Sequence, residues 1–181
     1  MARLAAFLRG INVGGHRVAK EELRDCFESI GLTDVVTFRA SGNVVFEADD
    51  RNPERLGGRI ERALCEGLSY EVRTFVRTAA QVRAIAGHRP FATELVEASA
   101  GKLQVLLLPG EPRRQARAEV LAQATDADRL TFGDRELYWL PSGRMADSAL
   151  DLKAIERAIG PTTMRTKGTV EAIAGRYFGD A

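Results

Sequence analysis

The residues best suited to chemistry lie in the run RGINVGG, from Arg9 to Gly15. Residues 3–9 are typical of an apolar strand and a helical period begins soon after the run, so the run connects a strand to a helix. The glycines at Gly10, Gly14 and Gly15 permit positive φ angles and a close approach of the backbone to a ligand. Backbone N–H groups at a helix N-terminus, together with a guanidinium, suit a bound anion. The run predicts an anion-binding loop; a plain turn in which Arg9 forms a structural ion pair is the other interpretation.

The run matches neither of the familiar phosphate-binding motifs. A Walker A loop needs GK[ST] and a dinucleotide-binding loop needs GxGxxG, and the run has neither pattern. Asn12 supplies an amide that could orient a ligand. The residues that follow, His16, Arg17 and Lys20, keep the region cationic.

A second polar motif, Ser41-Gly42-Asn43, separates two predicted strands at 35–40 and 44–48. This composition is typical of a hairpin turn. In a βαββαβ order the first and third strands are antiparallel neighbours, so the start of the third strand lies beside the end of the first. We therefore expect Ser41 and Asn43 to lie near Arg9, although a hairpin turn without a ligand explains the motif equally simply.

A third motif, TTMRTKGTV at residues 162–170, precedes the last predicted helix. Thr166 is a candidate N-cap for that helix. Arg165 and Lys167 lie at its start, where cations are unfavourable unless an anion is bound. Arg165 and Thr169 are therefore candidates for a second anion contact, and a surface helix start with solvated charges is the alternative.

No catalytic or metal-binding arrangement can be built from residue spacing. The two cysteines, Cys26 and Cys65, both fall in predicted helices and are expected to be small buried hydrophobic residues. Only two histidines, His16 and His88, could join them in a metal site. The sequence therefore predicts no metal and no cofactor, and it leaves open whether the protein is an enzyme.

Composition indicates a globular protein with a substantial core, since 45% of the 181 residues are hydrophobic and 28% are charged. The net charge of +1 lies far from that of a strongly basic nucleic-acid binder. No apolar run reaches the ~18 residues that a membrane span requires. The short apolar stretch at the N-terminus does not resemble a secretory signal, so we expect a cytoplasmic protein.

The order of predicted elements in the first half is βαββαβ, and the last of these strands ends near Arg77. The second half repeats βαββα more loosely and ends in a helix. The sequence thus predicts an α+β fold of two ferredoxin-like (βαββαβ, alpha-beta plait) subdomains, the second modified with a C-terminal helix. The expected boundaries are 1–86 for the first subdomain, 87–101 for a linker and 102–181 for the second.

Across its whole length the chain resembles a bacterial family, domain of unknown function 1697. The resemblance rests on AAFLRGINVGG, ESIGLTDV, SGNVVF, the RTxxxV pattern at 77–82 and the late T-x-R-T-x-x-T-V segment. It implies two α/β-plait subdomains and no particular activity. Many relatives have an Asn-Trp pair where this chain has Thr166-Lys167. The family-typical positions are Arg9, Gly10, Asn12, Gly14, Gly15, Ser41, Gly42, Asn43, Arg165 and Thr169.

Three functions follow as hypotheses. The first is a site for a small anionic ligand, phosphate- or nucleotide-like, at the first loop, with Arg165 closing over it. The second is an interaction or oligomerisation module without a small ligand, since the fold itself does not fix a function. The third is binding of single-stranded nucleic acid through a sheet of the RRM kind, which is disfavoured because Asn43 and Val45 stand where stacking aromatic residues are needed.

Overall fold

The computed structural model describes residues 1–12, 14–39 and 42–179. The chain forms two compact units, one of Met1–Ile85 with Ile173–Ala181 and one of Ala86–Ala172. The chain passes between the units within two helices, α3 (Ala79–Gly87) and α7 (Lys167–Tyr177). Each unit contains a four-stranded antiparallel sheet, which confirms the predicted α+β class.

The first unit has the predicted βαββαβ order, and its strands are arranged β2-β3-β1-β4. The start of β3 pairs with the end of β1, with Phe7 opposite Asn43, as the topology predicted. The register of β1 with β4 places Arg9 opposite Arg73. The elements are β1 (Ala2–Arg9), α1 (Lys20–Glu28), β2 (Thr33–Thr37), β3 (Asn43–Ala48), α2 (Pro53–Leu68) and β4 (Arg73–Thr78).

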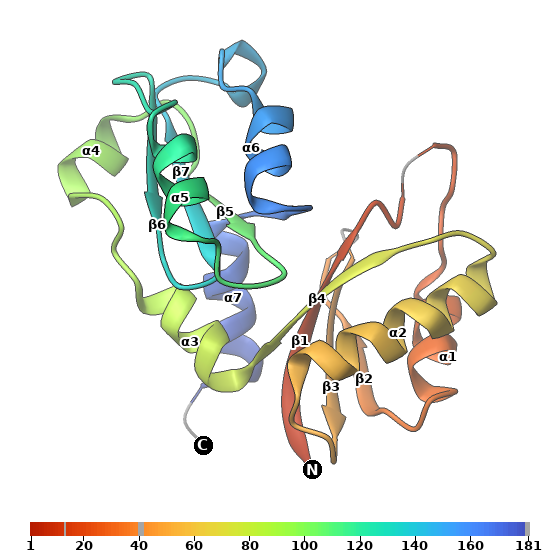
Figure 1. Cartoon of the computed structure of the whole chain (residues 1–181). Coiled ribbons are helices and arrows are strands. Elements are labelled where there is room, and N and C mark those ends of the chain that lie inside the picture. The colour runs from red at the N-terminus through yellow and green to blue at the C-terminus, as the bar shows by residue number, and fades with distance from the viewer. Residues whose placement is uncertain (13, 40–41, 180–181) are drawn as a thin grey trace. The chain divides into compact units, whose positions relative to one another are not determined.

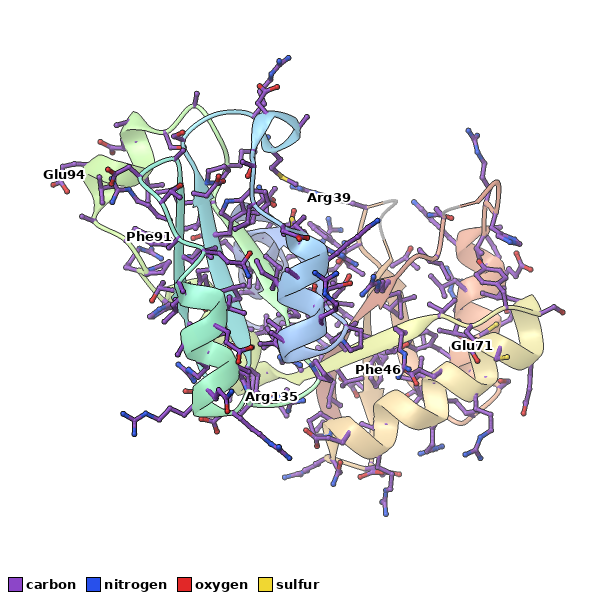
Figure 2. The ribbon with its side chains drawn as sticks, turned by 45° about the horizontal axis from the view of Figure 1, so that its top comes forward. Arg39, Phe46, Glu71, Phe91, Glu94 and Arg135 are labelled. Atoms are coloured by element: carbon purple, nitrogen blue, oxygen red, sulfur yellow. The ribbon has the colours of Figure 1, made fainter. Side chains whose placement is uncertain are left out.

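Helices α1 and α2 lie along one face of this sheet (Figure 1). Alternate residues of β1 point into the core beneath them, namely Leu4, Ala6 and Leu8. The ring of Phe46 in β3, labelled in Figure 2, meets that of Phe27 in α1 edge to face, with centroids 5.6 Å apart. The apolar stripes predicted for both helices therefore form one core with the sheet.

The second unit repeats the topology, with its strands arranged β6-β7-β5-β8. Helices α5 and α6 lie side by side in this unit (Figure 1). A short helix, α4 (Thr93–Ala98), lies within the stretch predicted to be a linker. The remaining elements are β5 (Gln104–Leu107), α5 (Arg114–Leu121), β6 (Asp128–Phe132), β7 (Glu136–Pro141), a 3-10 turn η1 (Met145–Asp147), α6 (Leu152–Ile159) and β8 (Thr163–Thr166).

Strand β8 corrects the sequence prediction, which had no fourth strand in the second half. It pairs antiparallel with β5 and completes the ferredoxin-like sheet, and the predicted C-terminal helix follows it directly as α7. Four residues are too few to show the period-2 pattern of a strand, and three of the four are polar. The pairing with β5, which is a long-range contact, is what makes this segment a strand.

Thr78 and Thr166 are the N-cap residues of the helices that follow the two sheets, α3 and α7. Each ends the fourth strand of its sheet, and each hydroxyl accepts a hydrogen bond from the backbone N–H three residues later, at 3.3 Å from Gln81 and 3.2 Å from Thr169. The predicted N-cap at Thr166 is confirmed. So is the capping box at Thr78, because the Gln81 side chain accepts from the Thr78 N–H at 2.9 Å.

The predictions for the start of α2 and for Cys26 are confirmed, and the prediction for Cys65 was wrong. Asn52 caps α2 by accepting from the Arg55 N–H at 2.9 Å, and Pro53 follows as the first helical residue. Cys26 is buried, but Cys65 is exposed. Cys65 follows the buried Leu64 by one residue, which turns it about 100° around the helix and out of the core.

No helix in the described part of the chain is both long and apolar enough to cross a membrane. The cytoplasmic location expected from the sequence stays a prediction.

Candidate functional site

A cavity of about 760 Å³ lies in the first unit, between the β1–α1 connection and the β2–β3 connection. We call it the loop cavity. Its volume is within the range of about 300–1,000 Å³ that is usual for small-molecule sites. Its lining residues are Ile11, Asn12, Gly15, His16, Arg17, Val18, Ala19, Lys20, Leu23, Thr37, Arg39, Gly42 and Asn43.

The β1–α1 connection is shaped by its glycines and by a hydrogen bond from the Val18 N–H to the Asn12 side chain. Gly10, Gly14 and Gly15 all have φ between 65° and 89°, the left-handed region that the sequence predicted for them. Asn12 Oδ1 accepts from the Val18 N–H at 3.2 Å, which closes the loop. The loop is therefore a shaped structure that ends at the N-terminus of α1.

Tyr70 holds this loop from outside the cavity lining. Its hydroxyl donates to the Ile11 carbonyl at 2.8 Å, and its ring stacks on His16 with centroids 4.2 Å apart. Burial, and then the charges of Glu22 and Cys26, raise the pKa of Tyr70, so the phenol remains a hydrogen-bond donor over the physiological range. The tyrosine thus fixes both the backbone and one side chain of the cavity wall.

The β2–β3 connection is tied to β1 at Gly42. The Leu8 N–H donates to the Gly42 carbonyl at 2.7 Å. Gly42 has φ 68°, and a Cβ added there would come within 2.9 Å of Ile11 Cγ2 and 3.0 Å of Leu8 Cβ. Glycine is required at this position, because any side chain would push the two cavity walls apart.

Arg39 is a lining residue on the β2–β3 connection, where Figure 2 labels it. Its φ of 57° is in the left-handed region, which is uncommon for a residue other than glycine, asparagine or aspartate. Its guanidinium lies 5.1 Å from the centroid of the Phe38 ring, within cation–π range. Such backbone strain is typical of positions that are held for a functional reason.

The charged lining of the loop cavity is entirely cationic among the described residues. Arg17 and Lys20 are exposed side chains from the α1 end, and Arg39 comes from the opposite wall. Ala19 occupies the N-cap of α1 and has no side-chain oxygen to accept from the first N–H groups of the helix. The positive end of the helix dipole and the three cations therefore contribute potential of one sign.

The sequence-predicted site residues divide into two groups. Asn12, Gly15 and Asn43 line the loop cavity, whereas Arg9, Gly10 and Gly14 are not among its lining residues. Ser41 lies outside the residues that the structure describes.

Asn43, one of the predicted ligand contacts, has an internal partner. Asn43 is buried, and its Nδ2 donates to the Phe38 carbonyl at 3.1 Å, so part of its amide supports the hairpin. Arg9 is half-buried at the end of β1. The roles proposed for these residues toward a ligand stay predictions.

Arg165 and Thr169 belong to the second unit. Arg165 Nη1 donates to Thr163 Oγ1 at 2.9 Å and to the Met164 carbonyl at 2.7 Å, and burial lowers its pKa to about 10. The Thr169 hydroxyl lies 2.9 Å from that of Thr166. The participation of Arg165 and Thr169 in an anion site stays a prediction.

Lys167 has partners that account for a cation at the start of α7. Its ammonium forms an ion pair with Glu171 at 2.6 Å and donates to the Ala86 carbonyl at 2.7 Å. A protein carboxylate one helical turn away thus offsets the charge, and the position of Lys167 does not require a bound anion.

Sequence reasoning missed Arg39 and Thr37 as lining residues. The sequence places Arg39 two residues before Ser41, but nothing in the pattern FRASGNV indicates that the chain turns left-handed there. His16, Arg17 and Lys20 were recognised only as residues near the predicted loop. A search for basic residues on both sides of two loops that the topology brings together would have found Arg39 with these three residues, but not Thr37.

A second cavity, of about 420 Å³, lies in the second unit beside the buried Asp128. The Asp128 Oδ1 accepts from Trp139 Nε1 at 2.8 Å and from Ser148 Oγ at 2.7 Å. Asp151, also in its lining, caps α6 by accepting from the Ala154 N–H at 2.9 Å. These carboxylates support the fold, and the described residues contain no group of three potential metal ligands.

Comparison with known families shows which family the chain matches. Residues 1–138 match the family described as protein of unknown function (DUF1697). The chain belongs to the DUF1697 family. The loop cavity lies wholly within the matched residues, so the cavity belongs to the part of the chain that carries the family likeness.

The DUF1697 chain is also similar to a solved structure, that of a conserved bacterial protein from Streptococcus pneumoniae. The two are 20% identical, the match covers 96% of this chain and 97% of the other, and the TM-score is 0.71. At this identity the likeness shows a shared fold and carries no activity with it. No curated protein is similar enough to the chain to match it.

Proposed function

We propose that this protein binds a small anionic ligand, phosphate- or nucleotide-like, in the loop cavity. The observation that carries the proposal is the sign of the charges. Arg17 and Lys20 on one wall and Arg39 on the other are the fully charged side chains of the described lining, and all three are cations. A bound anion would be attracted to cationic side chains of this lining.

The N-terminus of α1 adds to this support. Lys20 is the first residue of α1, where the helix dipole makes a cation unfavourable by a few tenths of a kcal/mol or more. Glu21 and Glu22 in the first turn offset part of this cost, but neither lines the cavity. An anion in the cavity would interact favourably with the N–H groups of the first turn as well as with Lys20.

The proposal is one of binding, and it assigns no chemical step. The lining contains one imidazole, His16, and one hydroxyl, Thr37, together with amides and cations. A nucleophile paired with a general base is the usual signature of hydrolytic or transfer chemistry. The described lining offers no nucleophile paired with a general base, and binding of an anionic metabolite is the function that the geometry supports best.

Nucleic-acid binding through the sheet gains no support from the structure. The strands that an RRM uses correspond to β1 and β3, both described in full. On the face away from α1 and α2, Phe7 is their only aromatic residue, and Asn43 and Val45 occupy the positions beside it. Sequence-tolerant stacking of successive bases needs aromatic residues on both strands.

A thermal-shift screen tests the proposal. Wild type, the double variant Arg17→Gln/Lys20→Gln and the control Arg24→Gln, an exposed arginine of α1 outside the cavity, are heated with phosphate, pyrophosphate, AMP and ribose 5-phosphate. A ligand at a hundredfold excess over Kd stabilises the native state by about 2.7 kcal/mol. We expect stabilisation of wild type and Arg24→Gln and little in the double variant. Equal stabilisation of all three proteins, or of none, would contradict the proposal.

A further inference from the structure

We infer that the ligand of the loop cavity is a nucleotide whose base stacks on the ring of His16 while its phosphate meets Arg17 and Lys20. This inference rests on the proposed function and names the class of ligand that the same cavity takes.

The first observation is the stacking of the His16 ring on Tyr70. Its ring is stacked on Tyr70, with an angle of 27° between the ring planes, and His16 lines the cavity whereas Tyr70 does not. An imidazole has two faces, and Tyr70 covers one of them. His16 is exposed, and its face turned away from Tyr70 is the one that we assign to the base.

The second observation is that a hydrogen bond anchors Tyr70 to the cavity wall. The Tyr70 hydroxyl bonds to the Ile11 carbonyl, so the ring beneath His16 is anchored to the loop that forms the cavity wall. A planar ligand ring that stacks on a preordered side chain loses less conformational entropy than one that must order its partner. Histidine is among the side chains on which proteins stack nucleic-acid bases.

The third observation is the mixed character of the cavity wall. Ile11, Val18 and Leu23 give it an apolar part, beside the cations already described. Inorganic phosphate would leave that apolar surface and most of the 760 Å³ unused. A molecule with a planar, weakly polar ring at one end and a phosphate at the other uses both parts.

The order of residues in the chain supports the same placement of the ligand's base and phosphate. His16 is followed directly by Arg17, and Lys20 begins α1 three residues later. A ring on His16 and an anion at the start of α1 would therefore be separated by only a few residues of one segment. The base and the phosphate of one nucleotide are likewise joined through a single sugar.

Isothermal titration of the full chain tests the inference with two probes that differ by the base alone, AMP and ribose 5-phosphate. The variants are His16→Ala, which removes the ring, and His16→Phe, which keeps a ring to stack on Tyr70. His16 is exposed, so neither change opens a cavity in the core, and circular dichroism verifies folding. We expect His16→Ala to weaken AMP binding about fivefold or more, the lower end of what base stacking contributes.

Three outcomes are distinguishable. Weaker AMP binding in His16→Ala, recovery in His16→Phe and unchanged binding of ribose 5-phosphate would support the inference. Equal affinities for AMP and ribose 5-phosphate, or equal AMP binding with and without the His16 ring, would overturn it and leave the anion site standing. Binding of neither probe nor of pyrophosphate to wild type would overturn both proposals.

Discussion

Leu8 and Gly42 join the two loops that form the loop cavity. The Leu8 N–H donates to the Gly42 carbonyl at 2.7 Å, at the point where β1 ends and β3 is about to begin. The antiparallel pairing of β1 with β3 is what brings these residues together from opposite ends of a long stretch of chain. The cavity is therefore a consequence of the ferredoxin-like strand order as much as of the residues that line it.

Gly42→Ala tests how tightly this junction is built. The left-handed φ and the contacts at 2.9–3.0 Å leave no room for a Cβ, so we expect a loss of about 1–3 kcal/mol in the free energy of unfolding. Gly58→Ala in α2, where an added Cβ meets nothing within 4 Å, is the matched control and should be neutral or stabilising. Urea denaturation measures both variants. Equal stability of Gly42→Ala and wild type would show that the hairpin is not held as described.

Arg39→Asn should separate binding from stability. Asparagine tolerates the left-handed region better than arginine does, so the exposed position should keep its stability within about 0.5 kcal/mol or gain slightly. The variant loses one of the cavity cations, so the affinity for phosphate or AMP should fall. Denaturation and titration of the same preparation give the two quantities. Unchanged affinity would remove Arg39 from the proposed site.

Asp128 tests the packing of the second unit. It accepts from Trp139 Nε1 and Ser148 Oγ, and the indole is almost fully buried. Asp128→Ala leaves the buried indole N–H without this acceptor, and we expect a loss of about 1–3 kcal/mol. Asp128→Asn retains a carbonyl oxygen and should cost less. Tryptophan fluorescence during urea denaturation reports on this unit directly, because Trp139 is the single tryptophan of the chain.

The two thiols should differ sharply in reactivity. Burial, followed by the charges of Glu22 and Asp25, raises the pKa of Cys26, which disfavours the reactive thiolate, whereas Cys65 is exposed. A thiol reagent at neutral pH should therefore modify one cysteine rapidly in the native protein and two after unfolding. Cys65→Ser should abolish the rapid phase. Rapid modification of both thiols in native wild type would contradict the packing of α1.

Much of the first unit could be predicted from the sequence, because local signals and the fold agree there. Asn52-Pro53 marks the start of α2, Thr78 and Gln81 form the expected capping box, and the neighbouring positions of β1 and β3 follow from the order of elements. These features depend on a few adjacent residues or on topology alone. Both the adjacent residues and the order of elements can be read directly from the sequence.

The features that escaped prediction depend on long-range contacts or on backbone conformation. Strand β8 exists because β5 pairs with it, and its four residues show no period of their own. Arg39 lines the cavity with a positive φ, and an arginine in a sequence gives no signal of that backbone conformation. Arg9 ends β1 opposite Arg73 and is not among the residues that line the cavity, and its role toward a ligand stays a prediction.

The most direct test of the central claim is a titration of isotopically labelled protein with AMP, followed by amide chemical shifts, at low and moderate salt. We expect the largest changes at residues 11–20 and 37–43, weaker binding at the higher salt concentration, and loss of the changes in Arg17→Gln/Lys20→Gln but not in Arg24→Gln. Shift changes confined to other parts of the chain, or identical titrations of wild type and the double variant, would contradict a ligand site in the loop cavity.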